Sequence, residues 1–178
     1  MSPTLIRFAR ARQKYPSAHR GGGLGVSVDV GSVHVRLLPR EFEKIAVADR
    51  GAVVDFELEI GPLTLKLRRV RVAGALTGVE RRGSMVEALL SDGEGSVRVR
   101  AWNQAADALL GLKQGEFVEV LGTLRVYRGE LYVAASIVRR IGSEGFNAYV
   151  KLLERDRRVL SALHARKEES EPQPPRTR

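Results

Sequence analysis

Hydrophobic and polar residues alternate along most of the chain up to about residue 141, and this two-residue period is typical of half-buried β-strands. Steps such as Gly61-Pro62 separate the alternating stretches and mark turns. The expected strands cover residues 26–30, 33–37, 53–60, 85–90, 97–102, 117–127 and 131–141, with one more long strand that starts at Leu63. Residues 40–49 are expected to form a short helical turn or a loop.

The long strand that starts at Leu63 changes phase along its length. Its apolar residues occupy odd positions up to Leu67 and even positions from Val70. We interpret this slip as a β-bulge within one strand, because a bulge lets a strand bend around a small barrel. Gly74 and Gly122 lie inside strands, where a barrel needs sharp coiling.

A short helix interrupts the strands at residues 103–110, with Asn103 as a suitable N-cap and alanines and leucines on its apolar side. Three strands, this helix and two further strands follow the order of a five-stranded OB barrel. The pattern therefore predicts a mainly β protein built on an OB-fold Greek-key barrel at about 63–142. With an N-terminal β extension, the domain covers 24–142.

The period changes to that of a helix after residue 142, which predicts a C-terminal amphipathic helix at 143–167. Its apolar stripe consists of Phe146, Tyr149, Val150, Leu153, Leu160 and Leu163. The stripe either folds onto its own barrel or packs against helices of other subunits. We favour the subunit interface, because the barrel fills its own interior. Residues 168–178 are polar and proline-rich and are expected to be disordered.

The formal net charge is +9 and the pI is about 10.4, which favours a polyanionic partner such as nucleic acid or an anionic membrane. Residues 1–23 contain five Arg or Lys residues and no acid. They are expected to form a disordered basic arm, which either lies on phosphates or is a solvated end.

The sequence lacks the usual signatures of enzymes and metal sites. It has no cysteine, and its three histidines are far apart in the sequence. No phosphate-binding GxxxxGK[ST] motif is present, so we expect no enzyme, no cofactor, no metal and no small-molecule substrate. No apolar run approaches the length of a membrane span or a signal peptide, so we expect an intracellular protein that acts with DNA.

Outward-facing residues of two strands carry the candidate chemistry. In strand 97–102, Arg98, Arg100 and Trp102 share the face opposite the apolar residues, and arginines beside an aromatic are typical of single-strand binding. The full set of candidate binding residues is Trp102, Tyr127, Arg98, Arg100, Arg125 and Arg128, with Arg81 and Arg82 in the loop after the first barrel strand. The alternatives are that Trp102 is a core aromatic at the strand end, that Tyr127 covers the barrel end, that the strand arginines form a solvated face and that residues 81–83 form a flexible basic loop with no role in binding.

Four segments resemble a known family. They are FELEIGPLTLKLRRVRVAGALTGVE, VRVRAW, VEVLGTLRVYRGELYV and FNAYVKLLERDRRVLSAL. Residues from about 33 to 166 resemble, in this order, the middle subunit of archaeal-type replication protein A, a single-strand DNA-binding heterotrimer. A related telomere-capping OB subunit has the same plan. The resemblance implies that Trp102 and Tyr127 stack on bases and that residues 146–163 join a three-helix bundle.

We therefore predict a non-catalytic single-stranded DNA-binding subunit that protects DNA in replication, repair or recombination. Its expected partners are single-stranded DNA and other replication protein A-like subunits, bound through the C-terminal helix. We expect no association with a membrane, and a location in the cytoplasm or nucleoid if the protein is archaeal. Two alternatives remain open, namely an assembly subunit with minor nucleic-acid contact and an RNA-binding OB module.

Overall fold

The alternating pattern folds into two β-sheets, which a computed structural model describes for residues 26–49, 51 and 53–170. The expected arm at 1–23 and residues 171–178 of the expected tail lie outside the described residues. The strands are β1 (Val26–Asp29), β2 (His34–Leu37), β3 (Ala46–Asp49), β4 (Val54–Ile60), β5 (Leu63–Leu67), β6 (Arg69–Arg82), β7 (Met85–Ser91), β8 (Ser96–Trp102), β9 (Phe117–Tyr127) and β10 (Glu130–Arg140). The helices are η1 (Pro39–Lys44), α1 (Asn103–Leu110) and α2 (Gly142–Ser170).

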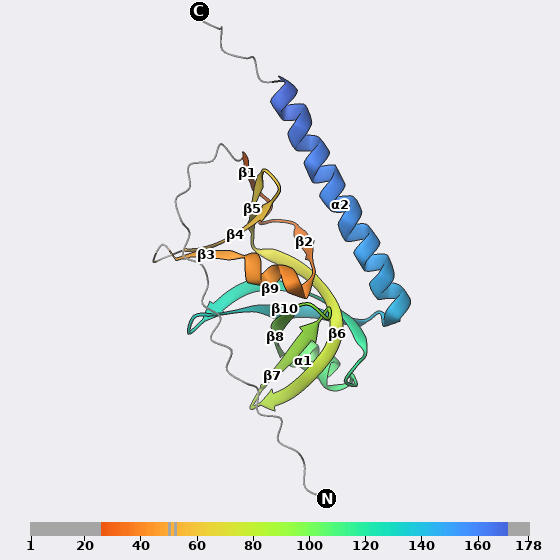
Figure 1. Cartoon of the computed structure of the whole chain (residues 1–178). Coiled ribbons are helices and arrows are strands. Elements are labelled where there is room, and N and C mark those ends of the chain that lie inside the picture. The colour runs from red at the N-terminus through yellow and green to blue at the C-terminus, as the bar shows by residue number, and fades with distance from the viewer. Residues whose placement is uncertain (1–25, 50, 52, 171–178) are drawn as a thin grey trace, which may run out of the picture.

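Strands β6 to β10 form a closed barrel (Figure 1). Their order is β6-β7-β8-β10-β9, and pairing of β6 with β9 closes the ring. Strand β10 runs parallel to β8 and antiparallel to β9, and α1 connects β8 to β9. This is the topology of the OB fold, so the predicted fold class is confirmed.

The N-terminal extension forms a second, four-stranded sheet in the order β1-β5-β4-β3, while β2 pairs with barrel strand β6. The interpretation of Leu63 onward as one bulged strand is wrong. The chain bends at Arg68, where it passes from β5 in the small sheet to β6 in the barrel. Leu67 is the last residue of β5 and Val70 is the second residue of β6, and the side chains of both point into the core. The bend between them accounts for the change from odd to even apolar positions. The barrel strands themselves therefore begin at Arg69 rather than at residue 63.

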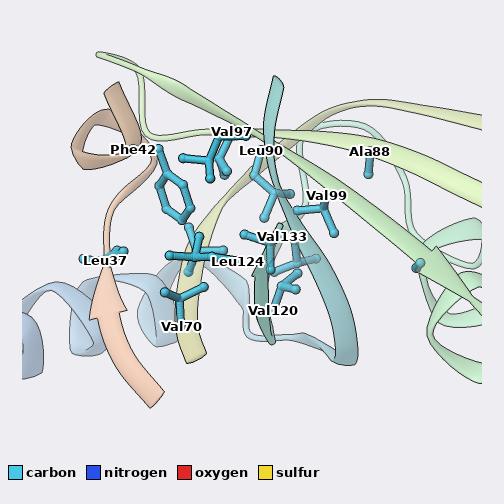
Figure 2. Close-up of a cluster of buried hydrophobic side chains, with 14 of the residues drawn as sticks. Leu37, Phe42, Val70, Ala88, Leu90, Val97, Val99, Val120, Leu124 and Val133 are labelled. Carbon is cyan, nitrogen blue, oxygen red and sulfur yellow. The ribbon is translucent and has the colours of Figure 1, made fainter. Parts of the chain in front are cut away.

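The barrel interior holds the expected apolar residues. Inward-facing side chains of β8 and β9, including Val97, Val99 and Val120, are buried, and Figure 2 shows them packed with Leu124 and Val133. Gly74 is required here, because a Cβ at this position would lie 2.7 Å from the carbonyl oxygen of Ser91 on the neighbouring strand. The same conflict arises at Gly122 with the backbone of Ala134.

Residues 40–49 contain more regular structure than expected. Phe42 in η1 and Ile45 after it are buried in the main core, and the short strand β3 follows. The turn between β7 and β8 fastens this segment, since the Asp92 carboxylate accepts hydrogen bonds from the backbone N–H and the Nε of Arg40 at 3.1 and 2.8 Å.

Helix α1 begins differently from the prediction. Asn103 is not its N-cap but its first helical residue, with φ 52°, and the extended residue Trp102 occupies the cap position without a side-chain hydrogen bond. Helix α2 starts at Gly142 and continues to Ser170, so it extends past the expected end at 167. No helix in the described part of the chain is long and apolar enough to cross a membrane.

Half of the predicted stripe of α2 packs against the chain's own barrel (Figure 1). Tyr149 and Leu153 are buried there, and the Phe146 ring stacks on Phe117 with centroids 4.8 Å apart. Tyr149 is held by its hydroxyl, which lies 2.9 and 2.6 Å from two main-chain carbonyl oxygens, those of Leu37 and Arg71. Burial raises the pKa of Tyr149 above its usual range.

The remaining stripe residues are more accessible. Val150 and Leu160 are half-buried, and Leu160 packs at the edge of the main core. Leu163 is 58% exposed and lies near the far end of the helix.

Candidate nucleic-acid interface

Strand β8 presents its polar residues outward, as its alternation predicts. Val97, Val99 and Ala101 are buried, while Arg98 and Arg100 are half-buried and Trp102 is 39% exposed. Trp102 therefore does not lie in the core, because its ring remains partly open to solvent at the end of the strand.

The outward residues of β8 continue onto three neighbouring strands. Across the sheet, Arg100 is opposite Glu87 of β7 and Ala134 of β10, and Tyr132 of β10 is opposite Arg125 of β9. These strands thus share one surface, here called the outer face. Its members of interest are Glu87, Arg98, Arg100, Trp102, Arg125, Tyr127 and Tyr132.

Glu87 lies at the centre of the outer face and is only 3% exposed. Its carboxylate accepts hydrogen bonds from Arg98 Nη1 at 3.0 Å and Arg100 Nε at 2.9 Å. Glu130 lies 3.6 and 3.7 Å from the same two guanidinium groups. Carboxylates therefore hold the two arginines in fixed orientations. This arrangement differs from the alternative in which these arginines are simply solvated.

Tyrosine rings support the arginines from the side. The guanidinium carbon of Arg100 lies 4.4 Å from the ring centroid of Tyr132 and 5.7 Å from that of Tyr127. Arg128 covers Tyr127 at 5.2 Å, yet Tyr127 remains 53% exposed. These distances are typical of cation–π contacts. The arrangement leaves two accessible aromatic rings, Trp102 and Tyr127, on either side of Arg100.

Arg81 and Arg82 are the last two residues of β6 rather than loop residues, and both are exposed. Gly83, with φ 64°, forms the turn that follows them. Arg82 donates a hydrogen bond to Glu80 at 2.9 Å, and this bond together with the attraction of Glu87 raises the pKa of Arg82. Arg81 makes no ion pair within the described residues.

Sequence reasoning missed Glu87 and Tyr132. Both residues occupy outward positions of strands that flank β8, and the alternation of those strands predicts that outward orientation. It does not predict which residues lie beside them, because this depends on the order of the strands in the sheet. The available signal was the short antiparallel link from β7 to β8, which places Glu87 opposite Arg100.

The fold and the outer face together identify the class of domain to which this chain belongs. A closed five-stranded barrel whose outer face carries arginines and exposed aromatics is an OB-fold domain, and residues 70–141 match the family described as "OB-fold nucleic acid binding domain". The chain belongs to the family of the "uncharacterized 18.7 kDa protein in ribosomal RNA operon" of Thermofilum pendens. The two are 32% identical over 132 residues, which cover 72% of this chain and 77% of that protein.

The predicted resemblance to the middle subunit of replication protein A is also confirmed. Replication factor A protein 2 of Schizosaccharomyces pombe is 27% identical over 77 residues, 43% of this chain and 27% of that protein. The chain thus spans only about a quarter of that relative's length.

Two solved structures share the fold. A chain of the replication protein A heterotrimer bound to ssDNA aligns with a TM-score of 0.52 and 20% identity, over 72% of this chain and 97% of that one. A chain of the S. pombe Stn1-ten1 complex aligns with a TM-score of 0.54 and 15% identity, over 70% and 90%.

Proposed function

We propose that this chain is a non-catalytic single-stranded DNA-binding subunit of a replication protein A-like complex, which protects DNA in replication, repair or recombination. The outer face carries this proposal, because it combines two exposed aromatic rings with arginines held in place between them. The likeness to Replication factor A protein 2 supports the same assignment.

The aromatic rings supply most of the binding free energy in this account. One base stacks on Trp102 and another on Tyr127, at about 1–3 kcal/mol per base. The two rings act as separate platforms because Arg100 lies between them. Stacking is possible for every base, so binding should tolerate sequence.

The arginines contact the phosphate backbone. Arg125 and Arg128 have no carboxylate partner within the described residues, so they retain their full charge for phosphates. Arg98 and Arg100 are partly neutralised by Glu87 and orient the strand rather than attract it. Arg81 and Arg82 would extend the contact past the Trp102 end, since Arg82 is opposite Met85 and Met85 is opposite Trp102.

Helix α2 would join the chain to other subunits. Besides its barrel-facing residues it has a second apolar stripe of exposed side chains, spaced by seven and four residues as one helical face requires. This stripe consists of Leu152, Val159 and Leu163, which are 39%, 51% and 58% exposed. Figure 1 shows that the C-terminal end of α2 extends past the barrel, where a partner can reach it.

A pair of variants tests the two parts of this proposal. Trp102→Ala should lower the affinity for a fluorescent oligo-dT strand about tenfold, given the stacking free energy of a base, and leave the oligomeric state unchanged. Leu163→Asp should disrupt assembly in light scattering of the chain with its co-purified partners and leave oligo-dT binding by the chain intact. If Trp102→Ala changed assembly or stability but hardly changed affinity, the chain would be mainly an assembly subunit.

A second candidate function is RNA binding, which is favoured by the relative found in a ribosomal RNA operon. The choice depends on contacts with the 2′-hydroxyl group. Equal-length dT and rU strands distinguish the two: tighter binding of rU would replace the proposal of a DNA-binding subunit with that of an RNA-binding module.

A further inference from the structure

A groove separates strand β4 of the small sheet from strand β9 of the barrel. It forms where β9 runs past the start of its neighbour: β6 starts at Arg69, opposite Thr123, and β9 continues four residues beyond that pair. The Leu124 N–H donates to the Arg68 carbonyl at 2.9 Å, next to the groove. The groove has a volume of about 360 Å³ and is lined by Val53, Val54, Phe56, Arg68, Thr123, Leu124, Arg125 and Val126.

The groove has an apolar floor and basic walls. Phe56 and Leu124 are buried at 6% and 2% exposure, and Val53 at the rim is 49% exposed. Arg68 and Arg125 are exposed, and neither makes an ion pair within the described residues. Among the described residues, no carboxylate lines this groove. Its charge therefore contrasts with that around Arg98 and Arg100 on the outer face, which Glu87 and Glu130 partly neutralise.

Arg125 belongs to both surfaces. It lines the groove and is also opposite Tyr132, which contacts Arg100 on the outer face. Tyr127 follows on the same side of β9, two residues further along. A nucleic-acid strand that crosses the outer face past these residues therefore reaches the groove next.

We propose that the β4–β9 groove is a second subsite for the nucleic-acid strand. The phosphate of one nucleotide lies between Arg68 and Arg125, and its base packs against Val53 over the apolar floor. This inference rests on the proposed function and extends it, because it makes the N-terminal sheet one wall of the binding channel. A neighbouring groove also lined by Arg68 holds both acidic and basic side chains, namely Asp29, Asp55, Lys66 and Arg69, and the proposed subsite does not include it.

A length series of oligo-dT strands tests the subsite. Wild-type affinity should rise in an additional step once the strand is long enough to reach the groove. Arg68→Ala should remove this step and weaken binding of long strands about 3- to 10-fold, as expected for one lost phosphate contact, without changing the binding of short strands. The matched control is Arg158→Ala, which removes an exposed arginine from α2. Unchanged melting temperatures of both variants show that the comparison concerns binding.

A reporter inside the groove gives the second readout. Val53→Trp combined with Trp102→Phe leaves a single tryptophan at the rim of the groove. Long strands should quench it and short strands should not. The inference is overturned if long strands bind this variant without quenching, or if Arg68→Ala and Arg158→Ala lose the same affinity. Absence of any strand binding by the wild-type chain would refute the proposed function itself, and it is visible separately as unquenched Trp102.

Discussion

Replacing Glu87 with glutamine should change stability and affinity in opposite directions. Glu87 is buried at the centre of the proposed interface and holds Arg98 and Arg100 through two charge-assisted hydrogen bonds. The variant keeps the shape of the side chain and one acceptor oxygen, but its NH₂ group must face a guanidinium. Removing one partner of a fully buried pair costs about 3–5 kcal/mol.

The cost should be smaller at this site. The side chains of Arg98 and Arg100 are 26% and 11% exposed, so both can turn toward water, and Glu130 remains within 3.7 Å of each. We therefore expect Glu87→Gln to lower the free energy of unfolding by about 1–3 kcal/mol. A decrease in the urea midpoint with unchanged slope measures this loss.

Affinity should rise because the outer face gains one net positive charge. For a single strand the dependence of log K on log salt steepens by about 0.7 per additional phosphate neutralised. Binding at low salt should tighten about 2- to 10-fold, and the gain should vanish at high salt. The assay is fluorescence anisotropy of an oligo-dT strand at several salt concentrations.

The matched control is Glu119→Gln. Glu119 is as buried as Glu87, but it is held by Arg71 and Arg139 on the part of the barrel that α2 covers. This variant should lose stability without changing affinity or its salt dependence. Weaker binding by Glu87→Gln, or the same change in both variants, would refute the reasoning about the charge of the outer face.

Two further predictions concern the contacts that fix the frame of the domain. Tyr149→Phe should lower the free energy of unfolding by about 1–2 kcal/mol in urea titrations, because the Leu37 N–H loses its hydroxyl acceptor and the carbonyls of Leu37 and Arg71 lose the donor that they share. Loss of oligo-dT affinity at a temperature where the variant is folded would contradict a purely structural role. Burial alone would raise the pKa of Asp92, but the hydrogen bonds that its carboxylate accepts, first among them the one from the Arg40 side chain, together outweigh burial, so the pKa is lowered. The Asp92 carboxylate therefore stabilises the fold at pH values above its unfolded pKa, and this stabilisation is lost as the pH falls through the lowered pKa. Asp92→Asn should therefore weaken the fall in the free energy of unfolding between about pH 6 and 2. The same fall in the variant as in the wild type would show that Asp92 does not contribute to it.

The sequence predicted those features that depend on local pattern. Alternation located β8 and its outward Arg98, Arg100 and Trp102, and it located most of the other strands. It misread the step from Leu67 to Val70, because a phase slip looks the same in a bulge as in a passage between two sheets. The strand β3 was missed because its sequence, Ala-Val-Ala-Asp, does not alternate between apolar and polar residues.

Long-range contacts escaped the sequence for a different reason. The partners of Tyr149 are carbonyl groups 112 and 78 residues away, and main-chain carbonyls leave no trace in a pattern of side chains. The sequence therefore predicts the apolar stripe of α2, but it does not predict which half of the stripe faces the barrel. The groove beside Arg68 likewise exists only because two sheets meet there.

Quenching of Trp102 fluorescence by an oligo-dT strand, titrated at low and at moderate salt, tests the central claim most directly. Trp102 is the single tryptophan of the chain, so the signal reports on one place on the outer face. We predict strong quenching that weakens as the salt concentration rises, because a base stacks on the ring while arginines contact phosphates. A folded protein whose Trp102 emission stays unchanged at saturating strand would contradict the proposal that the outer face binds single-stranded DNA.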